Sequence, residues 1–308
     1  MTIRTFTKIL SLPIASLALL ACTPATATCP PAEGLALQIL GSGGPIADDA
    51  RASSGYLVWI DGQSRVLIDA GGGTFLRFGE AGATFKALDF IGLSHFHTDH
   101  SADFPALIKS GNFSGRDRSL SIAGPAGDGR FPGLKDFLQS MLGKNQGAYA
   151  YLSSFLDGTA STPMLTPREI SHGETTIVYT SEDLSIDAMR VPHGIVPAAA
   201  FRVRTGNQTF VFATDQNGAD PAFVEFAKGA DVLVMHMVVP ENVEGVGRRL
   251  HAPPSVIGEI AAGAGPGKLV LSHFMARSLA NLEQNVSLVR ERYKGDVIVA
   301  EDLACIRP

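Results

Sequence analysis

Short apolar runs recur along the chain, separated by segments rich in glycine, proline, aspartate and asparagine. Runs of this kind that contain β-branched and aromatic residues predict buried strands. We expect strands at residues 35–40, 56–60, 65–68, 90–93, 120–123, 176–179, 201–204, 210–213, 231–235, 269–271 and 297–299. Asp61 and Gly62, between the second and third of these runs, predict a hairpin.

Longer segments between the later strands have apolar residues at helical spacing, at 221–228, 255–264 and 279–292. Strands interrupted by such helices predict an α+β protein in which two sheets pack face to face with helices outside. The 308 residues are 45% hydrophobic and include 33 glycines, so the chain can bury a large core and turn often. We find no internal repeat and expect a single domain over residues 28–308.

The segment 112–170 leaves two interpretations open. Apolar positions recur at helical spacing in its residues 131–142, and Tyr149, Tyr151 and Phe155 follow. One interpretation is a helical hairpin that packs on the sandwich. The other is a lid or specificity insertion whose aromatic face covers the functional site, which would suit a small, partly apolar substrate.

Residue types that bind metals are concentrated in the segment 94–103. His95, His97, Asp99 and His100 have the spacing H-x-H-x-D-H, directly after an apolar run. Alternate side chains of an extended segment point the same way, so His95 and His97 can bind one ion together. Asp99 and His100, on the turn into the next helix, can face a second ion. The pattern therefore predicts a metal site.

Further candidates follow later apolar runs. His193, Asp215 and His273 each stand at the end of a predicted strand, where any one of them alone would be an ordinary polar residue. Their common placement, together with the cluster at 95–100, favours a shared metal site. His236 has a similar position, but we interpret it as a buried strand-end residue or as a partner of a ligand.

These residues resemble the metallo-β-lactamase fold superfamily, and within it the ribonuclease Z-like branch. The resemblance covers about residues 37–273. Besides the match at 93–103, it includes the segments 41–45, 67–73, 124–127, 212–215 and 271–274, with Arg277. It implies a four-layer αββα sandwich and two Zn²⁺ ions per chain.

The resemblance also implies a ligand set for each ion. It assigns one zinc ion to His95, His97, His193 and Asp215. It assigns the other to Asp99, His100, Asp215 and His273, so that Asp215 bridges the two ions. His251 matches a histidine of this branch that assists at the scissile phosphate.

This ligand set predicts a hydrolase. Two zinc ions bridged by a carboxylate can lower the pKa of a shared water enough to give hydroxide near neutral pH. Asp99 can orient the proton of this nucleophile, and His251 can donate a proton to the leaving group. We expect a dinuclear zinc enzyme that acts on small phosphodiester substrates through the metal-bound hydroxide. The alternative is a β-lactamase or lactonase acting on a cyclic amide or ester, and a zinc-binding protein without activity comes third.

The charge of the chain argues against a nucleic acid polymer as the substrate. Removal of residues 1–27 would take away Arg4 and Lys8 and change the net charge from −5 to −7. Proteins that bind long polyanions normally carry a basic stripe, whereas the arginines here are scattered. The interval between His193 and Asp215 is also short, and in ribonuclease Z it usually holds the arm that grips transfer RNA.

The first 27 residues resemble a bacterial export signal. Arg4 and Lys8 precede an apolar stretch at 9–21 that is too short for a stable membrane span. Residues 19–22 resemble a lipoprotein cleavage site, and 25–27 are a competing ordinary cleavage site. The mature protein would accordingly be periplasmic, or anchored in a bacterial envelope through a lipid on Cys22.

Two cysteines remain in the mature chain in either case. Cys29 precedes the first predicted strand, and Cys305 stands near the C-terminus. An even number of cysteines in an oxidising compartment favours a disulfide over two free thiols. The bond requires the two Cα atoms to lie within about 7 Å of each other.

Overall fold

A computed structural model describes residues 29–30, 33–159, 164–173 and 175–308. The expected export signal at 1–27, with Cys22, lies outside these residues. None of the helices in the described part of the chain is both long enough and apolar enough to span a membrane.

The described residues form two seven-stranded sheets. The first has the order β14 (Cys305–Ile306), β1 (Leu35–Gly41), β2 (Gly55–Ile60), β3 (Gln63–Ile68), β4 (Phe90–Gly92), β5 (Leu120–Pro125) and β6 (Leu165–Ile170). The second has the order β13 (Asp296–Val299), β12 (Lys268–Ser272), β11 (Val232–His236), β10 (Gln208–Phe212), β9 (Val196–Thr205), β8 (Ser185–His193) and β7 (Thr176–Thr180). Strands β3 to β6 are parallel in the first sheet, and β10 to β13 are parallel in the second.

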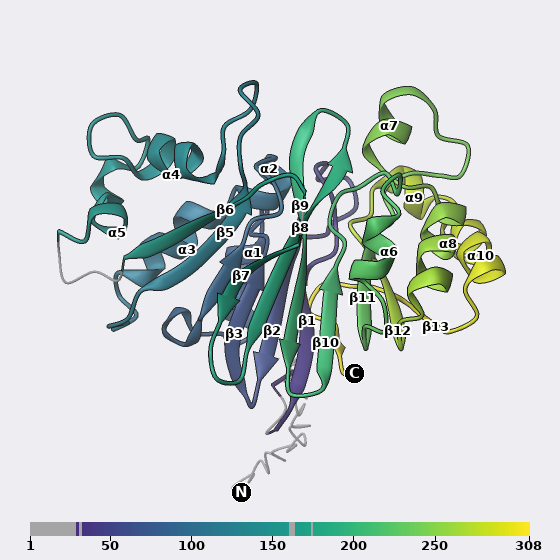
Figure 1. Cartoon of the computed structure of the whole chain (residues 1–308), viewed down its shortest axis with the longest axis horizontal. Coiled ribbons are helices and arrows are strands. Elements are labelled where there is room, and N and C mark those ends of the chain that lie inside the picture. The colour runs from purple at the N-terminus through teal and green to yellow at the C-terminus, as the bar shows by residue number, and fades with distance from the viewer. Residues whose placement is uncertain (1–28, 31–32, 160–163, 174) are drawn as a thin grey trace, which may run out of the picture.

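Helices lie outside both sheets (Figure 1). Along the first sheet these are α1 (Thr74–Glu80), η1 (Phe85–Ala87), α2 (Thr98–Ser101), α3 (Phe104–Gly111), α4 (Leu134–Leu142), η2 (Ala150–Leu152) and α5 (Ser154–Asp157). With the second sheet come α6 (Ala222–Phe226), α7 (Gly245–Leu250), α8 (Pro254–Ala264), α9 (Ala276–Leu279) and α10 (Leu282–Arg292). The four layers are those expected from the sequence, and the αββα sandwich is confirmed.

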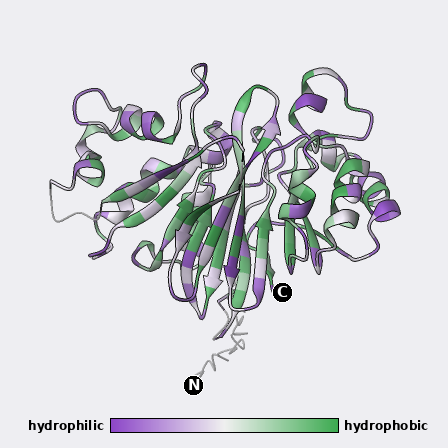
Figure 2. Ribbon diagram, viewed as in Figure 1, coloured by the Kyte–Doolittle hydropathy of each residue, from purple (hydrophilic) through white to green (hydrophobic). Residues whose placement is uncertain are grey.

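Strand β1 shows why these sheets are buried on both faces. Leu35, Leu37 and Ile39 belong to the core cluster that fills the space between the sheets. Ala36 and Leu40, at the intervening positions, belong to the cluster under the helices α1 to α5. Because successive side chains of a strand point to opposite faces, a strand between two apolar layers must be apolar throughout. Figure 2 shows this as hydrophobic colour along the central strands.

Aromatic side chains join the two sheets. Phe90 of β4 and Phe201 of β9 meet edge to face with their ring centroids 6.1 Å apart. Tyr56 of β2 and Phe212 of β10 are 5.7 Å apart. The second contact lies near the candidate ligands, because Phe212 ends β10 and the Tyr56 hydroxyl is 2.9 Å from His236 Nε2.

Most predicted strands are confirmed, and so is the hairpin between β2 and β3. Its turn residues Asp61 and Gly62 have φ values of 48° and 75°, the left-handed values that a two-residue hairpin turn requires. Strand β6 was not predicted, because an edge strand with one exposed face reads as a polar segment. The helix expected at 279–292 was too long, since the chain bends between α9 and α10.

The structure places segment 112–170 in the sheet and its outer helix layer. It contributes β5 and β6 and, between them, helices whose apolar residues pack on the outer face of the first sheet. Phe155 is fully buried there, whereas Tyr151 is exposed. None of the described residues of this segment lines the cleft at the candidate ligands. Phe137 of α4 stacks on Phe96, which does line this cleft, with ring centroids 4.3 Å apart. The packing of the helices on the sheet is thus observed, and a lid over the site stays a prediction.

The two remaining cysteines form a disulfide, as the sequence predicted. The Cα atoms of Cys29 and Cys305 are 5.3 Å apart, and the bond joins residues separated by 276 positions. Beside it, β14 pairs with β1 through Ile306 and Leu37. The bond therefore ties both ends of the described chain to the same edge of the first sheet.

Replacing both cysteines, as Cys29→Ser with Cys305→Ser, should lower the free energy of unfolding by about 2–4 kcal/mol, because the unfolded chain loses its longest loop constraint. Urea unfolding of the double variant and of the wild type under identical conditions measures the difference. Equal midpoints and slopes would show that the bond does not restrict the unfolded state.

Candidate metal centre

The candidate ligands meet because parallel strands end at the same edge of each sheet. Strands β3 and β4 carry the chain into Asp69 and the segment 94–100. Strands β10, β11 and β12 carry it into Asp215, His236 and His273. The two edges face each other across the sandwich, in the region of α2 and α9 in Figure 1. Residues far apart in the sequence are thus brought to one place.

The first group consists of His95, His97, His193 and Asp215, whose ligand atoms all lie within 4.8 Å of one another. His95 Nε2 is 2.9 Å from His97 Nδ1. The carboxylate atom Asp215 Oδ2 is 3.6 Å from His193 Nε2 and 3.9 Å from His95 Nε2. The sequence predicted these four residues as one ligand set, and the structure brings them together.

The second group consists of Asp99, His100 and His273, again with ligand atoms within 4.8 Å. His100 Nε2 is 2.9 Å from His273 Nε2, and Asp99 Oδ2 is 3.3 Å from His273 Nε2. Asp215 faces this group as well, with Oδ2 3.6 Å from His100 and Oδ1 3.5 Å from His273. Asp215 therefore lies between the two groups, in the position of a bridging ligand.

Hydrogen bonds behind the cluster leave nitrogen lone pairs pointing into it. His100 Nδ1 donates to Asp69 Oδ2 at 2.8 Å, which leaves Nε2 as an acceptor. His193 Nδ1 donates to the carbonyl of Leu250 at 2.9 Å, and its buried Nε2 has no hydrogen-bond partner within the described residues. Unprotonated nitrogens that face one another at 2.9 Å repel unless a cation lies between them. The residues present therefore fit metal ions.

Asp69 is a functional residue that the sequence analysis did not single out. It is fully buried and accepts hydrogen bonds from Ser94 N, Ser94 Oγ and His100 Nδ1. Like the predicted ligands it directly follows an apolar strand, β3, and this position was the available signal. The turn that follows Asp69 requires glycine at position 71, because a Cβ atom on Gly71 would lie 2.1 Å from the carbonyl oxygen of Asp99.

Three strand ends at the cluster have left-handed backbone conformations in residues other than glycine. The φ values are 61° at Asp69, 57° at Thr214 and 56° at His273. Such conformations cost roughly 1–3 kcal/mol each and persist only where the surrounding structure enforces them. Their position, at or next to candidate ligands, shows that the fold holds these side chains in a geometry that the local chain does not favour.

Burial and neighbouring charges set the protonation of the cluster. Burial, with His100 and His193 nearby, lowers the pKa of His95 well below its ordinary value. Burial would also lower the pKa of His100, but the carboxylates of Asp69 and Asp215 raise it well above the ordinary value. Burial would raise the pKa of Asp215, but neighbouring histidines hold it well below its usual range. The carboxylates are therefore charged and His95 is neutral, as metal ligands must be, whereas His100 must release a proton when a cation binds.

His236 supports the cluster from behind. Its Nδ1 donates to Asp215 Oδ1 at 2.7 Å, and its Nε2 is 2.9 Å from the hydroxyl of Tyr56. Burial lowers its pKa to about 3, so the ring is neutral. His236 also falls in a third group with Asp215 and His273 whose ligand atoms are close enough for an ion. Since both of its nitrogens have protein partners, we interpret it as orienting Asp215, in agreement with the sequence analysis.

A cleft of about 520 Å³ opens onto the ligands and contains His251. His251 follows α7 and precedes α8, in the predicted loop, and its Nδ1 is 3.7 Å from Asp215 Oδ1. Burial lowers its pKa to about 4. Apart from the candidate ligands, the remaining lining residues are mostly apolar and include one arginine: Pro45, Phe96, Thr98, Leu250, Met275 and Arg277.

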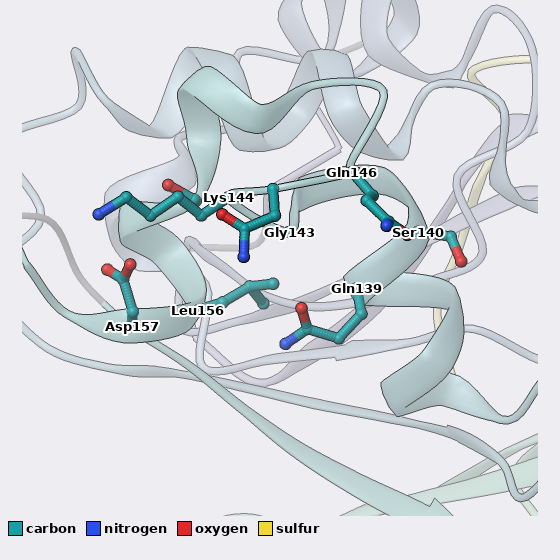
Figure 3. Close-up of a pocket in the computed structure, with 9 residues that line it drawn as sticks. Gln139, Ser140, Gly143, Lys144, Gln146, Leu156 and Asp157 are labelled. Atoms are coloured by element: carbon teal, nitrogen blue, oxygen red, sulfur yellow. The ribbon is translucent and has the colours of Figure 1, made fainter.

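A second cavity, shown in Figure 3, lies between α4 and α5, away from the ligand groups. Its side chains are mainly amides and hydroxyls, with Lys144 and Asp157 on one side. None of its lining residues belongs to a metal-binding group found among the described residues. Among the described residues, the groups that could bind a metal ion therefore lie at the cleft that contains Asp215.

Residues 64–274 match the family model described as "Beta-lactamase superfamily domain". The chain belongs to this superfamily. It is 26% identical over 282 residues to a protein named Ribonuclease Z from Mycolicibacterium gilvum, covering 87% of this chain and 94% of that one. The family and the His/Asp cluster together make the chain a metal-dependent hydrolase of the metallo-β-lactamase fold, related to ribonuclease Z.

Solved structures agree with this fold. The metallo-β-lactamase fold protein YhfI from Bacillus subtilis superposes with a TM-score of 0.68 at 23% identity, covering 88% of this chain and 98% of that one. The short form of human tRNase Z has a TM-score of 0.67 at 19% identity, with the same coverage.

Proposed function

We propose that the chain is a dinuclear zinc phosphodiesterase. One zinc ion would be held by His95, His97, His193 and Asp215, and the other by Asp99, His100, Asp215 and His273. The observation that carries this proposal is the position of Asp215, whose carboxylate lies within 4 Å of imidazoles from both groups. Imidazole and carboxylate ligands without cysteine suit zinc with an open position for substrate.

When bound, two zinc ions supply an ionised water as nucleophile and polarise the phosphoryl oxygen. Asp99, at the edge of the cleft, is placed to accept and orient a proton of the attacking water. His251 lines the cleft, with Nδ1 3.7 Å from Asp215 Oδ1. Its imidazole can deliver a proton to the oxygen of the leaving group once an anionic phosphodiester in the cleft raises its pKa from about 4.

The class of substrate is inferred from the relatives. The matching proteins named Ribonuclease Z and tRNase Z support phosphodiester hydrolysis, and the comparisons do not favour the β-lactamase or lactonase alternative. The same relatives also make a nucleic acid substrate possible, against the expectation drawn from the charge of the chain. We propose small phosphodiesters as the substrates because the negative net charge of the chain disfavours binding of a long polyanion. A precursor transfer RNA is included in the test below.

The cleft suggests what such a substrate looks like. Among the described residues, Arg277 is the only lysine or arginine that lines it, and the Nε of Arg277 donates to the carbonyl of Val238 at 3.2 Å. Around it the lining is apolar, and Ile195 and Val246, on the segments next to His193 and Leu250, are 61% and 60% exposed. We infer a substrate with one anionic phosphodiester and an apolar substituent.

We also propose that residues 1–27 act as an export signal and that the enzyme works in the periplasm or on a bacterial envelope. The disulfide between Cys29 and Cys305 supports this proposal, because such bonds persist mainly in oxidising compartments.

Zinc analysis and a substrate panel test the proposed function. The purified chain should bind two equivalents of zinc and hydrolyse bis-(p-nitrophenyl) phosphate much faster than a cephalosporin reporter or a long-chain lactone. A precursor transfer RNA, assayed beside them, should be cleaved poorly. One zinc equivalent in fully active protein would contradict the dinuclear site, and efficient cleavage of the RNA would replace the small substrate.

His251→Ala should lower turnover of bis-(p-nitrophenyl) phosphate about 100-fold or more, because proton transfer to the leaving group is lost. Zinc content should remain at the wild-type value. His172→Ala, the same substitution at an exposed histidine, is the control and should have no effect. Loss of zinc in the His251 variant would make this residue a ligand, and unchanged turnover would exclude it from the reaction.

Ile195→Ser should raise the KM for octyl p-nitrophenyl phosphate about fivefold and leave the KM for the methyl ester unchanged, because only the octyl chain reaches the apolar rim. Ile177→Ser, at an isoleucine that is 54% exposed on β7, is the matched control. If wild-type KM is the same for both esters, the apolar surface has no part in substrate binding.

A further inference from the structure

The position of His273 depends on a loop from the opposite end of the sequence. His273 has a left-handed backbone, with φ of 56°, so its conformation must be imposed from outside. The next residue, Phe274, donates from its N–H to Ser42 O and accepts from Gly44 N, both at 2.8 Å. Gly44 also packs directly against the ligand, since a Cβ atom there would lie 2.9 Å from His273 Cε1.

Asp302 holds this loop. Its Oδ1 accepts hydrogen bonds from Ser42 N at 3.0 Å and from Ser42 Oγ at 2.8 Å. Its Oδ2 accepts from Ala52 N at 2.8 Å and from Arg77 at 3.3 Å. One carboxylate therefore fastens both sides of the segment 42–52, and it is only 12% exposed. Hydrogen bonds to a charged acceptor of this kind are the stronger class.

Arg51 connects the same network to the aromatic ring beside the ligand. Its Nη1 donates to Ser42 Oγ at 2.6 Å and to the carbonyl of Ala300 at 2.9 Å. Its guanidinium lies 5.3 Å from the centroid of the Phe274 ring. The residue after His273 is thus held through both its backbone and its side chain.

The C-terminal segment that carries Asp302 is itself tied down. Leu303 N donates to Ile39 O at 2.6 Å, and Ile39 N donates to Ala304 O at 2.9 Å. The disulfide to Cys29 follows at Cys305. Asp302 therefore stands at a fixed place relative to β1, from which the loop 42–52 leaves.

We propose that Asp302 is a positioning residue for the half of the metal centre formed by Asp99, His100 and His273. The proposal rests on the dinuclear site proposed above. The other half is supported by different groups, since His193 donates to Leu250 O and His95 Nδ1 lies 3.0 Å from Ser94 Oγ. Removing the carboxylate of Asp302 should therefore weaken one zinc ion and leave the other unchanged.

Asp302→Asn tests this proposal, because it keeps the shape of the side chain but turns one acceptor oxygen into an amide N–H₂. This group cannot accept a hydrogen bond from Ser42 or Ala52. Zinc binding to the metal-free purified chain is measured by competition with a chromophoric chelator. The Kd of one zinc ion should rise about 10-fold or more, as for other groups that orient ligands. The Kd of the other zinc ion should remain within twofold of the wild-type value.

Two further variants complete the experiment. Ser42→Ala, a smaller change in the same network, should raise the Kd of the same zinc ion about threefold. Asp183→Asn is the matched control, since Asp183 also pairs with an arginine, Arg65, but on the β7–β8 turn. It should change neither Kd.

The outcomes separate this inference from the function on which it rests. Two wild-type Kd values in Asp302→Asn would overturn the positioning role, and so would an equal loss of both zinc ions together with a lower Tm. A wild-type chain that binds one zinc ion would overturn the dinuclear function, and this inference with it.

Discussion

The metal centre depends on one buried carboxylate. Asp215 is 2% exposed and lies within 4 Å of six histidines, which come from both sheets and from the loop after α7. A charge at this depth is costly unless it is paired and hydrogen-bonded. His236 supplies one hydrogen bond, and positive charge on the facing imidazoles or on bound metal ions supplies the rest. The packing of the two sheets therefore depends on the same charge pairs at Asp215 that would hold a metal ion.

The histidines around this carboxylate are themselves held by hydrogen bonds and backbone contacts from a second set of residues. Asp69 holds His100, Leu250 holds His193, and the loop at 42–44 holds His273. Each support comes from a segment distant in sequence from the ligand it holds. Left-handed backbone conformations at Asp69, Thr214 and His273 show that these supports outweigh local preferences. A ligand held in this way cannot relax when substrate or product exchanges, which keeps the geometry of the site constant.

The exposed side of the cluster differs from its buried side. Behind the ligands, tyrosine, serine and carboxylate groups form a continuous hydrogen-bond network. In front, the described residues that line the cleft beyond the ligands are Pro45, Phe96, Leu250 and Met275, which are apolar, together with Thr98, His251 and Arg277. An apolar wall strengthens the attraction between the few charges that remain, because water is largely excluded from between them. This contrast favours a substrate whose only charged group is the one that reacts.

The sequence alone determined the fold and the ligand types. Short apolar runs predicted the strands of the two sheets, since a buried strand must be apolar wherever both faces are covered. The H-x-H-x-D-H spacing and three polar strand ends predicted the metal ligands, which the structure brings within hydrogen-bonding or ligand distance of one another. These signals are local, so they can be read from short segments.

The tertiary structure decided what depends on distant segments. Asp69 follows an apolar strand in the sequence, but its partners Ser94 and His100, like Ser42 as the partner of Asp302, appear only in the tertiary structure. Strand β6 escaped the sequence pattern because its exposed edge is polar, and the sequence could not choose between the two interpretations of 112–170 because an apolar helix face looks the same whether it covers a sheet or a site. Which carboxylate faces which imidazole is set by the packing of two sheets, and no local pattern records it.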